Sequence, residues 1–363
     1  MCLDVLEQLG CEFPRRSLSI GLSTVSGLLE VKRGVKRRSK EEIDTMTIMD
    51  DPQRIAAMRL MDKLVHYCYS SQDKRLAIVM FKQFRWTLRY GCCDVSPTAI
   101  ATTGAMLSGV LFDFRGGSIY AQYALQMLEK MQLKTARTIF VAHAVVLHWT
   151  KPYQELLKPL LRSYELGLQT GDVETAMGST LLYILIGFYA GRPLEALEAD
   201  CRIYAHQAKQ HKRGQIESYI RMVWQLILNL MGRSENSAEL TGEAMDEGEF
   251  RSAAANSENP TMSIMIDTHK SIVCTFFGEH EMGAELALKM GEDLATVLVG
   301  SPHVAIHQFY KGISYFAMAR KTKKGKYIRE LQERRQRPSR SGGKRVVQTC
   351  TIWIHSLMLN LPP

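Results

Sequence analysis

Helix starts recur along this chain at a nearly constant interval, and that interval limits the fold more than any other feature. The first helices of successive pairs are expected to begin near residues 97, 135, 173, 214, 262 and 303, in steps of 38, 38, 41, 48 and 41 residues, with an earlier pair near residue 52. Two helices of four to five turns with short loops need about 40 residues. The alternation of period two that marks half-buried strands is almost absent. The spacing therefore predicts an all-α chain, an α-solenoid of stacked helix-turn-helix pairs.

The earliest pair shows the local signals on which this prediction rests. Asp51 is expected to cap a helix that has Pro52 at its first position, where the missing N–H costs nothing. Apolar residues then recur at helical spacing, namely Ile55, Met58, Met61 and Val65. A second helix is expected over residues 72–90, and Gly91 follows it where a left-handed residue often ends a helix.

Small residues are expected at the turns and crossings of the pairs. A glycine between the two helices of a pair is followed five residues later by a second small residue, as in Gly116 and Ala121, Gly191 and Ala196, and Gly278 and Gly283. Gly171 and Ala176 repeat this spacing but fall between the predicted pairs. The consensus tetratricopeptide (TPR) pattern of Trp, Leu, Gly and Tyr at fixed offsets is incomplete, so the pairs are expected to be TPR-like.

Composition divides the chain into three regions. We expect an amphipathic linker or hinge over residues 1–50, a TPR-like helical-repeat domain over 51–321 with a loop-rich insertion at about 232–261, and a basic, disordered tail over 322–363. The tail accounts for the net charge of +9, because twelve Lys or Arg and only two Glu lie between Arg320 and Arg345. A basic tail of this kind is compatible with nucleic acid or acidic lipid and with plain solvation, and we expect solvation.

The remaining composition indicates a cytoplasmic protein. The eight cysteines are scattered without a C-x-x-C pair, so reduced thiols are expected. The first nine residues include Asp4 and Glu7, which argues against a secretory segment. The longest apolar stretch, Leu181 to Ala190, is too short to span a bilayer. Within residues 1–50, apolar residues precede the basic run from Lys32 to Lys40, which is typical of a helix that packs on a neighbour or lies on a membrane surface.

Motifs that carry catalysis are incomplete. "SGGKRV" at 341–346 lacks the early glycine of a P-loop and has Arg345 in place of Ser or Thr. "DFRGG" at 113–117 has Arg115 where a kinase magnesium motif needs Gly, and no H-R-D occurs. Two pairs of potential metal ligands, His66 with Cys68 and His143 with His148, are spaced so that they diverge on a helix. No catalytic, cofactor-binding or metal-binding residue is therefore predicted, and neither a cofactor nor a small-molecule substrate is expected.

"FFGEHEMGAEL" at 276–286 allows two interpretations. It places His280, Glu281 and Leu286 as in the phosphoacceptor box of a sensor kinase. A phosphoacceptor histidine lies on a long helix, however, and Gly278 would interrupt that helix. The alternative is that Glu279 and His280 form the turn between two helices, and this is the interpretation we favour.

Several stretches in order resemble one known family. They are "FKQFRWTLRYG", "SGVLFDFRGG", "LLKPLLRSYELGLQTGDVETA", "LILNLMG", "LTGEAMDEGEF" and "HKSIVCTFFGEHEMGAELALKM". Over residues 3–320 the chain resembles the tetratricopeptide-like region of multidomain hybrid signalling kinases. Those proteins join a serine/threonine-kinase-like domain, an AAA-type ATPase, this helical region, a GAF domain and a histidine kinase. The kinase, ATPase and GAF motifs are missing here, so no site residue carries over, and we expect a truncated relative or an incomplete gene model.

The resemblance implies a non-catalytic scaffold in intracellular signal transduction that couples an ATPase module to a sensor-kinase output. Its expected partners are the ATPase, GAF or kinase domains of related proteins. One alternative is a fragment of an ATP-dependent serine/threonine–histidine hybrid kinase. A second is a helical protein that binds nucleic acid through the basic tail, although nucleic acid is not the partner we expect.

Overall fold

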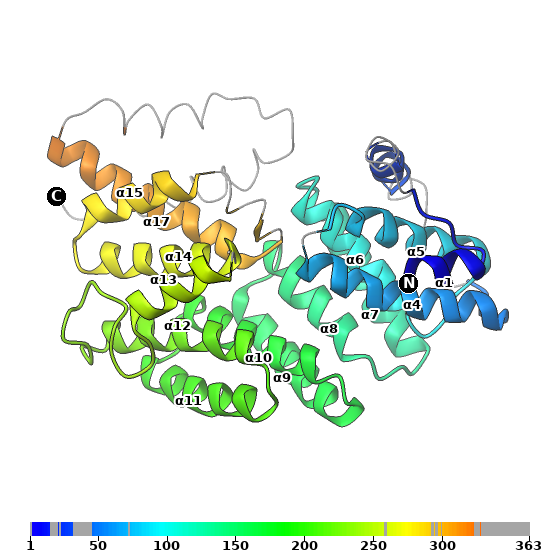
Figure 1. The fold of residues 1–363 in the computed structure, drawn as a ribbon, viewed down its shortest axis with the longest axis horizontal. Coiled ribbons are helices and arrows are strands. Elements are labelled where there is room, and N and C mark those ends of the chain that lie inside the picture. Colours follow the sequence, from blue (N-terminus) through cyan, green and yellow to red (C-terminus); the bar gives the residue numbers. More distant parts are fainter. Residues whose placement is uncertain are drawn as a thin grey trace. The chain divides into compact units, whose positions relative to one another are not determined.

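The structure, a computed structural model, describes residues 2–14, 21, 23–31, 46–71, 73–257, 260–291, 294, 297–298, 300–322 and 327 (Figure 1). Helices make up most of this part of the chain, and it contains no β-strand apart from an isolated bridge between Ile48 and Cys92. The predicted all-α class is thus confirmed. The chain forms two compact units, residues 1–150 and residues 151–363, and each is described separately.

Unit 1 contains the helices expected near residues 52, 72 and 97, and it also contains a first helix at residues 2–8 that is not predicted from the sequence. Its helices are α1 (Cys2–Gln8), a helical stretch over 23–31, α4 (Pro52–Ser70), α5 (Leu76–Tyr90), α6 (Ser96–Gly109), α7 (Phe114–Lys130) and α8 (Ala136–Phe140), which continues as the π-helix η1 (Val141–Val146) and the 3-10 helix η2 (Leu147–Trp149). Asp51 caps α4 as predicted, because its side chain accepts hydrogen bonds from the backbone of Gln53 at 2.9 Å and Arg54 at 3.3 Å.

The second helix begins four residues later than predicted. The Asp73 side chain accepts a hydrogen bond from the Arg75 backbone N–H at 2.8 Å, and the two side chains form an ion pair. This local bond competes with helix, so α5 starts only at Leu76. At the other end, Gly91 follows α5 with a φ of 99°, as the sequence indicates.

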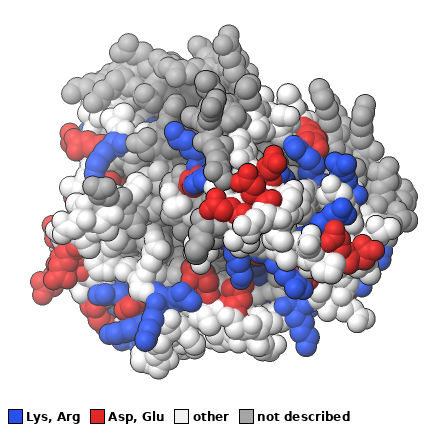
Figure 2. All heavy atoms as spheres, turned by 45° about the vertical axis from the view of Figure 1, so that its right-hand side comes forward, with Lys and Arg blue, Asp and Glu red and all other residues white. Residues whose placement is uncertain are grey.

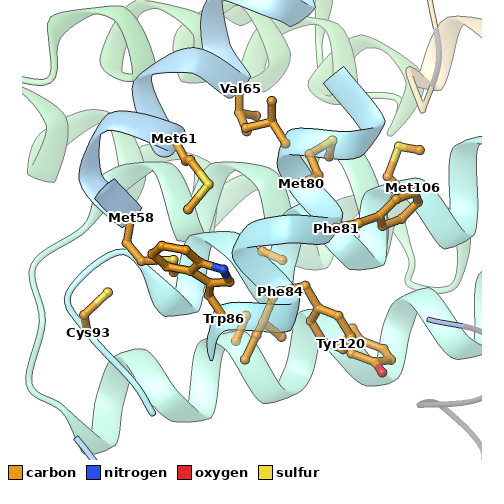
Figure 3. Close-up of a cluster of buried hydrophobic side chains, with 14 of the residues drawn as sticks. Met58, Met61, Val65, Met80, Phe81, Phe84, Trp86, Cys93, Met106 and Tyr120 are labelled. Atoms are coloured by element: carbon orange, nitrogen blue, oxygen red, sulfur yellow. The ribbon is translucent and has the colours of Figure 1, made fainter. Parts of the chain in front are cut away.

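The helices of unit 1 enclose a core rich in sulfur and aromatic rings (Figure 3). Buried side chains from α4 to α7 meet there, including Met58, Met61, Met80, Phe81, Phe84, Trp86, Met106 and Tyr120. Helices α6 and α7 touch at two glycines. A Cβ atom on Gly104 would lie 2.9 Å from the Gly117 carbonyl oxygen, and one on Gly117 would lie 2.8 Å from the Gly104 carbonyl oxygen. Only glycine allows this approach.

Unit 2 is a series of helices in which neighbours along the chain pack together (Figure 1). It comprises α9 (Tyr153–Thr170), α10 (Val173–Tyr189), α11 (Leu194–Gln210), α12 (Gly214–Leu230), α13 (Glu247–Asn256), α14 (Pro260–Phe276), α15 (His280–Met290) and α17 (Pro302–Thr322). The most extensive contacts join α9 with α10, α11 with α12, and α14 with α15. The predicted starts near 173, 214, 262 and 303 lie within two residues of observed helix starts.

The pairing of these helices differs from the prediction. The expected pair beginning near 135 does not form, because α8 belongs to unit 1 while α9 packs with α10. Gly171, with a φ of 76°, joins α9 to α10, and a Cβ atom on Gly167 would lie 2.9 Å from Ala176. The sequence places Gly171 and Ala176 between two pairs. In the structure they belong instead to the pair of α9 and α10, which has the most extensive contacts in unit 2. A period near 40 residues is the same whichever helix is counted first, so it cannot fix the pairing.

Two further small-residue predictions are half right. Gly116 lies inside the first turn of α7 and not between two helices, but Ala121 is fully buried next to Gly104 where α6 and α7 meet. Gly191, with a φ of 76°, does lie between α10 and α11, but Ala196 is exposed. The third is confirmed, since Gly278 with a φ of 80° separates α14 from α15. A Cβ atom on Gly283 would lie 2.7 Å from the Ser314 hydroxyl oxygen of α17, so this glycine does permit a close approach.

The insertion at 232–261 is loop-rich with one short helix, α13, as predicted. Two buried amides of α12 hold its loop. Asn229 donates from Nδ2 to the carbonyl oxygens of Ser237 at 3.0 Å and Glu239 at 2.5 Å. Gln225 accepts at Oε1 from the backbone N–H of Ala244 at 3.0 Å. Because these partners are backbone groups, the hydrogen bonds hold the loop in place without requiring particular side chains in the loop.

Two predicted features lie outside the described residues. They are the basic run of residues 32–40 and, apart from Thr322 and Tyr327, the basic tail of residues 322–363. Among the described helices, none combines the length and the apolar character that crossing a lipid bilayer requires.

Candidate interaction surface

The turn between α14 and α15 settles the two interpretations of "FFGEHEM". Helix α14 ends at Phe276, and the Glu279 backbone N–H then donates to the Cys274 carbonyl oxygen at 2.8 Å. Gly278 adopts a positive φ between them, and His280 is the first residue of an 11-residue helix. The turn interpretation is confirmed, with His280 itself inside α15. A histidine at the start of a short helix lacks the setting of a phosphoacceptor.

This turn carries apolar side chains into solvent. Phe276 is 58% exposed, Phe277 40% and Met282 44%, and we refer to these three residues as the turn surface. The Phe276 ring also contacts Tyr310 of α17, with 6.0 Å between ring centroids. Exposed apolar side chains that gather in one place mark interaction sites more often than scattered ones do.

Acidic side chains border the turn surface. Glu279, Glu281 and Glu285 are exposed beside it on the turn and on α15. Among the described residues, only Lys321 forms an ion pair with one of these three glutamates. Its Nζ lies 4.0 Å from the Glu281 carboxylate, and both side chains are exposed. Such a pair contributes little. The border therefore keeps its negative charge.

The base of the turn surface is firmly packed. Residues 264–274 of α14 are all buried, and α15 and α17 both pack against this helix. The hydroxyl groups of Thr275 and Ser314 lie 3.2 Å apart, next to the close approach at Gly283. A partner would therefore meet a preformed surface and lose little free energy in ordering it.

Charged side chains form a network of ion pairs along another side of α14, where Asp267 and Lys270 are buried. Lys270 Nζ lies 2.7 Å from the Glu247 carboxylate, and Arg251 bridges Glu247 at 3.0 Å and Asp267 at 2.7 Å. Lys289 lies 3.1 Å from Asp267. Burial by itself raises the pKa of Glu247, but hydrogen bonds from Lys270 and from the Leu240 backbone outweigh it and lower that pKa. Each charge has a partner, so this network fastens α13 to α14 and α15.

Two buried histidines lie on a further side of α14. The rings of His269 and His303 are 5.7 Å apart, and Ser301 Oγ lies 2.8 Å from Nδ1 of His303. Burial, with a smaller contribution from His303, lowers the pKa of His269 to about 3, and burial lowers the pKa of His303 to about 4. Both imidazoles are neutral at pH 7, so they behave as core side chains.

Of the histidine and cysteine pairs that the sequence draws attention to, only Cys68 and His148 are buried. His143 lies in the π-helix with Nδ1 2.9 Å from the Ile139 carbonyl oxygen, and burial lowers the pKa of His148 to about 3. Cys68 is buried in α4, and His66 is only partly buried. Within the described part of the chain, no three His, Cys, Asp or Glu side chains converge as metal ligands would.

The other residues of interest have structural roles where they are described. Asp113 of "DFRGG" caps α7 by accepting from the Gly116 backbone N–H at 3.0 Å, and "SGGKRV" lies outside the described residues. The cysteines described with their side chains are free and buried, namely Cys11, Cys68, Cys92, Cys93, Cys201 and Cys274. Burial, followed by repulsion from Cys93, raises the pKa of Cys92 to about 11, so that thiol is not a nucleophile at pH 7.

Comparison with known proteins adds no identification, since no family model and no curated protein matches the chain. The turn surface itself is absent from the sequence-based predictions. Its signal was present, because Phe276 and Phe277 directly precede a glycine that ends a helix. Side chains at the end of α14 extend beyond its last packed turn. The packing of α17 then decides which of these side chains stay exposed.

Proposed function

We propose that the chain is a non-catalytic protein-interaction module built as an α-solenoid of TPR-like helix pairs. The small residues at the helix crossings support this architecture, since Gly104 meets Gly117, Gly167 meets Ala176 and Gly283 meets Ser314. TPR-like pairs need small side chains where their two helices cross. Such arrays present extended surfaces on which other proteins dock.

The turn surface carries the functional part of the proposal. It joins exposed apolar side chains to a negatively charged border on a rigid base, and this combination suits a protein partner with an apolar anchor and basic neighbours. In this proposal the chain belongs to a cytoplasmic signal-transduction protein. Its partner is an ATPase, GAF or kinase domain of a related signalling protein, and its role is to couple an ATPase to a sensor-kinase output.

The charge distribution favours a protein over nucleic acid on the one face of the molecule that Figure 2 shows. Basic and acidic side chains are interspersed there. Phosphate backbones select instead for continuous basic areas. The basic tail, on which nucleic-acid binding would rest, lies outside the described residues.

The test is a binding assay with the full chain and purified ATPase, GAF and kinase domains of related signalling proteins. We expect at least one domain to bind, and the double substitution Phe276→Ser and Phe277→Ser to weaken binding at least about tenfold. Ile203→Ser is the matched control, because Ile203 is 54% exposed on α11, away from the α14–α15 turn. Binding of none of the domains at low and at moderate salt, or equal losses in both variants, would refute the proposal.

A further inference from the structure

Helix α17 lies along the turn surface and ends beside its acidic border. In the first half of the helix, the Tyr310 ring contacts Phe276 with 6.0 Å between ring centroids. In its last turn, Lys321 pairs with Glu281 of the border at 4.0 Å, and the helix ends at Thr322. Figure 1 shows α15 and α17 side by side, in agreement with the contacts between them. The chain therefore enters its basic tail next to the turn surface.

Beyond α17, Tyr327 is the one described residue of the tail, and it packs back onto these helices. Its side chain is buried, and its ring centroid lies 5.6 Å from that of Tyr315 in α17. The same apolar cluster contains Ala284 and Ala287 of α15. Ala284 follows Met282 of the turn surface by two positions. The tail thus starts against the helix that carries part of the turn surface, and does not lead away from it.

The sequence of the tail complements the turn surface and its border. From Arg329 to Arg345 it has seven Lys or Arg and two Glu, a net charge of +5. Residues 352–361, which we call the apolar segment, contain no Lys, Arg, Asp or Glu and include Ile352, Trp353, Ile354, Leu357, Met358, Leu359 and Leu361. An apolar anchor with basic neighbours is the partner that the turn surface suits, and this chain carries one itself.

The length of the tail lets the apolar segment reach the turn surface. Ile352 lies 25 positions after Tyr327, and an extended chain covers about 3.3 Å per residue, or about 80 Å over this length. Helix α15, which separates Tyr327 from the turn surface by less than its own length, has 11 residues and is about 16 Å long. A segment tethered this closely acts at roughly millimolar effective concentration, well above a second copy at micromolar concentration. The same chain is therefore the favoured source of an occupant.

We propose that the turn surface takes up the apolar segment of its own chain, with the basic residues before that segment against the acidic border. The proposal rests on the function proposed above, and it makes the apolar segment a competitor of the protein partner. A partner must displace the segment, so its apparent affinity is reduced to the fraction of chains in which the surface is free. Binding of the partner and release of the basic tail are thereby linked.

The test joins the turn surface to the tail of the full chain with a short bismaleimide, which links two thiols. Met282→Cys places a thiol in the turn surface, and Cys350 lies two positions before the apolar segment. Ile203→Cys on α11 is the matched control, because Ile203 is 54% exposed and Met282 44%. Each yield is corrected for the rate at which the new thiol reacts with a single maleimide. Peptide mass spectrometry should then find at least about tenfold more 282–350 product than 203–350 product.

Two substitutions in the tail remove the apolar anchor and leave the thiols in place. Trp353→Ser with Leu357→Ser, made in the Met282→Cys chain, should reduce the 282–350 product to the level of the control position. Salt at about 1 M, which shortens the screening length to about 3 Å, should reduce it at least about threefold. Equal products at positions 282 and 203, or no effect of the serines or of salt, overturns the proposal. A product that links two copies in place of one chain also overturns it, because a second copy is then the occupant.

Partner binding is measured separately, so the proposed function and the proposed occupant can fail independently. For a domain that binds the chain, Trp353→Ser with Leu357→Ser should raise the affinity at least about tenfold. Unchanged affinity in this variant overturns the competition and leaves the proposed function standing. Enrichment of the 282–350 product in a chain that binds none of the domains refutes the function and leaves the intramolecular contact standing.

Discussion

Replacing Gly104 by alanine sets two opposing effects against each other at the crossing of α6 and α7. Alanine favours a helix interior over glycine by about 1 kcal/mol. The new methyl group, however, would lie 2.9 Å from the Gly117 carbonyl oxygen and 3.3 Å from the Tyr120 Cβ. Neither atom is the end of a flexible side chain, so the helices must separate, and overpacking of this kind costs about 1–3 kcal/mol.

Because rigid groups meet the methyl group, we expect an overpacking cost of about 2 kcal/mol, which leaves a net loss of about 1 kcal/mol after the gain in helix propensity. For a unit of 150 residues this lowers the midpoint of thermal unfolding by about 2–4 °C. Thermal unfolding followed by tryptophan fluorescence measures the change, because Trp86 and Trp149 report on unit 1 and Trp224 reports on unit 2, which contains the control. Gly214→Ala is the control, because nothing lies within 4 Å of the added Cβ in that position at the start of α12. A Gly104→Ala chain as stable as the wild type, or more stable, would contradict the crossing geometry.

Two further predictions concern groups buried around α14. Lys270→Met removes a cation whose side chain is 8% exposed and leaves Arg251 as the remaining cation beside Glu247. Urea unfolding should show a loss of about 3 kcal/mol in the free energy of unfolding, at the lower end of the range for a broken buried ion pair. A loss below about 1 kcal/mol would show that water reaches this network. The neutral imidazole of His269 makes stability depend on pH, because its pKa of about 3 in the folded chain lies below the 6.5 of the unfolded chain. The unfolded chain therefore binds the proton first, and stability that is complete above pH 6.5 declines as the pH falls towards 3. His269→Leu should reduce the slope of unfolding free energy between pH 6 and pH 4 by about 1.4 kcal/mol per pH unit, and an unchanged slope would show that His269 is hydrated.

Helix positions could be predicted from this sequence because their signals are local. Asp51 and Pro52 mark the start of α4, and Gly278 marks the end of α14, without reference to any other part of the chain. The start of α5 was missed by four residues because the Asp73 side chain competes for a backbone N–H that a helix would otherwise use. That competition depends on one rotamer, which periodicity does not contain.

Contacts between helices were harder to predict for a different reason. Pairing of α9 with α10 depends on Gly167 meeting Ala176, and a spacing near 40 residues allows either choice of pair. The attachment of residues 2–14 depends on Cys11 reaching Met61, fifty positions away. The turn surface depends on which aromatic side chains α17 leaves uncovered. Each is a long-range relationship, and patterns within one segment do not encode it.

The encasement of α14 has a consequence for biosynthesis. Its neighbours α12 and α13 precede it in the chain, whereas α15 and α17 follow it. While the ribosome is still translating α15 and α17, one flank of α14 has no partner, and apolar residues there face water. Asp267 and Lys270 do not shield that flank, because their partners Arg251 and Glu247 belong to α13, which is already made at this stage. A nascent chain halted here should therefore aggregate readily until α15 and α17 have been made and cover α14.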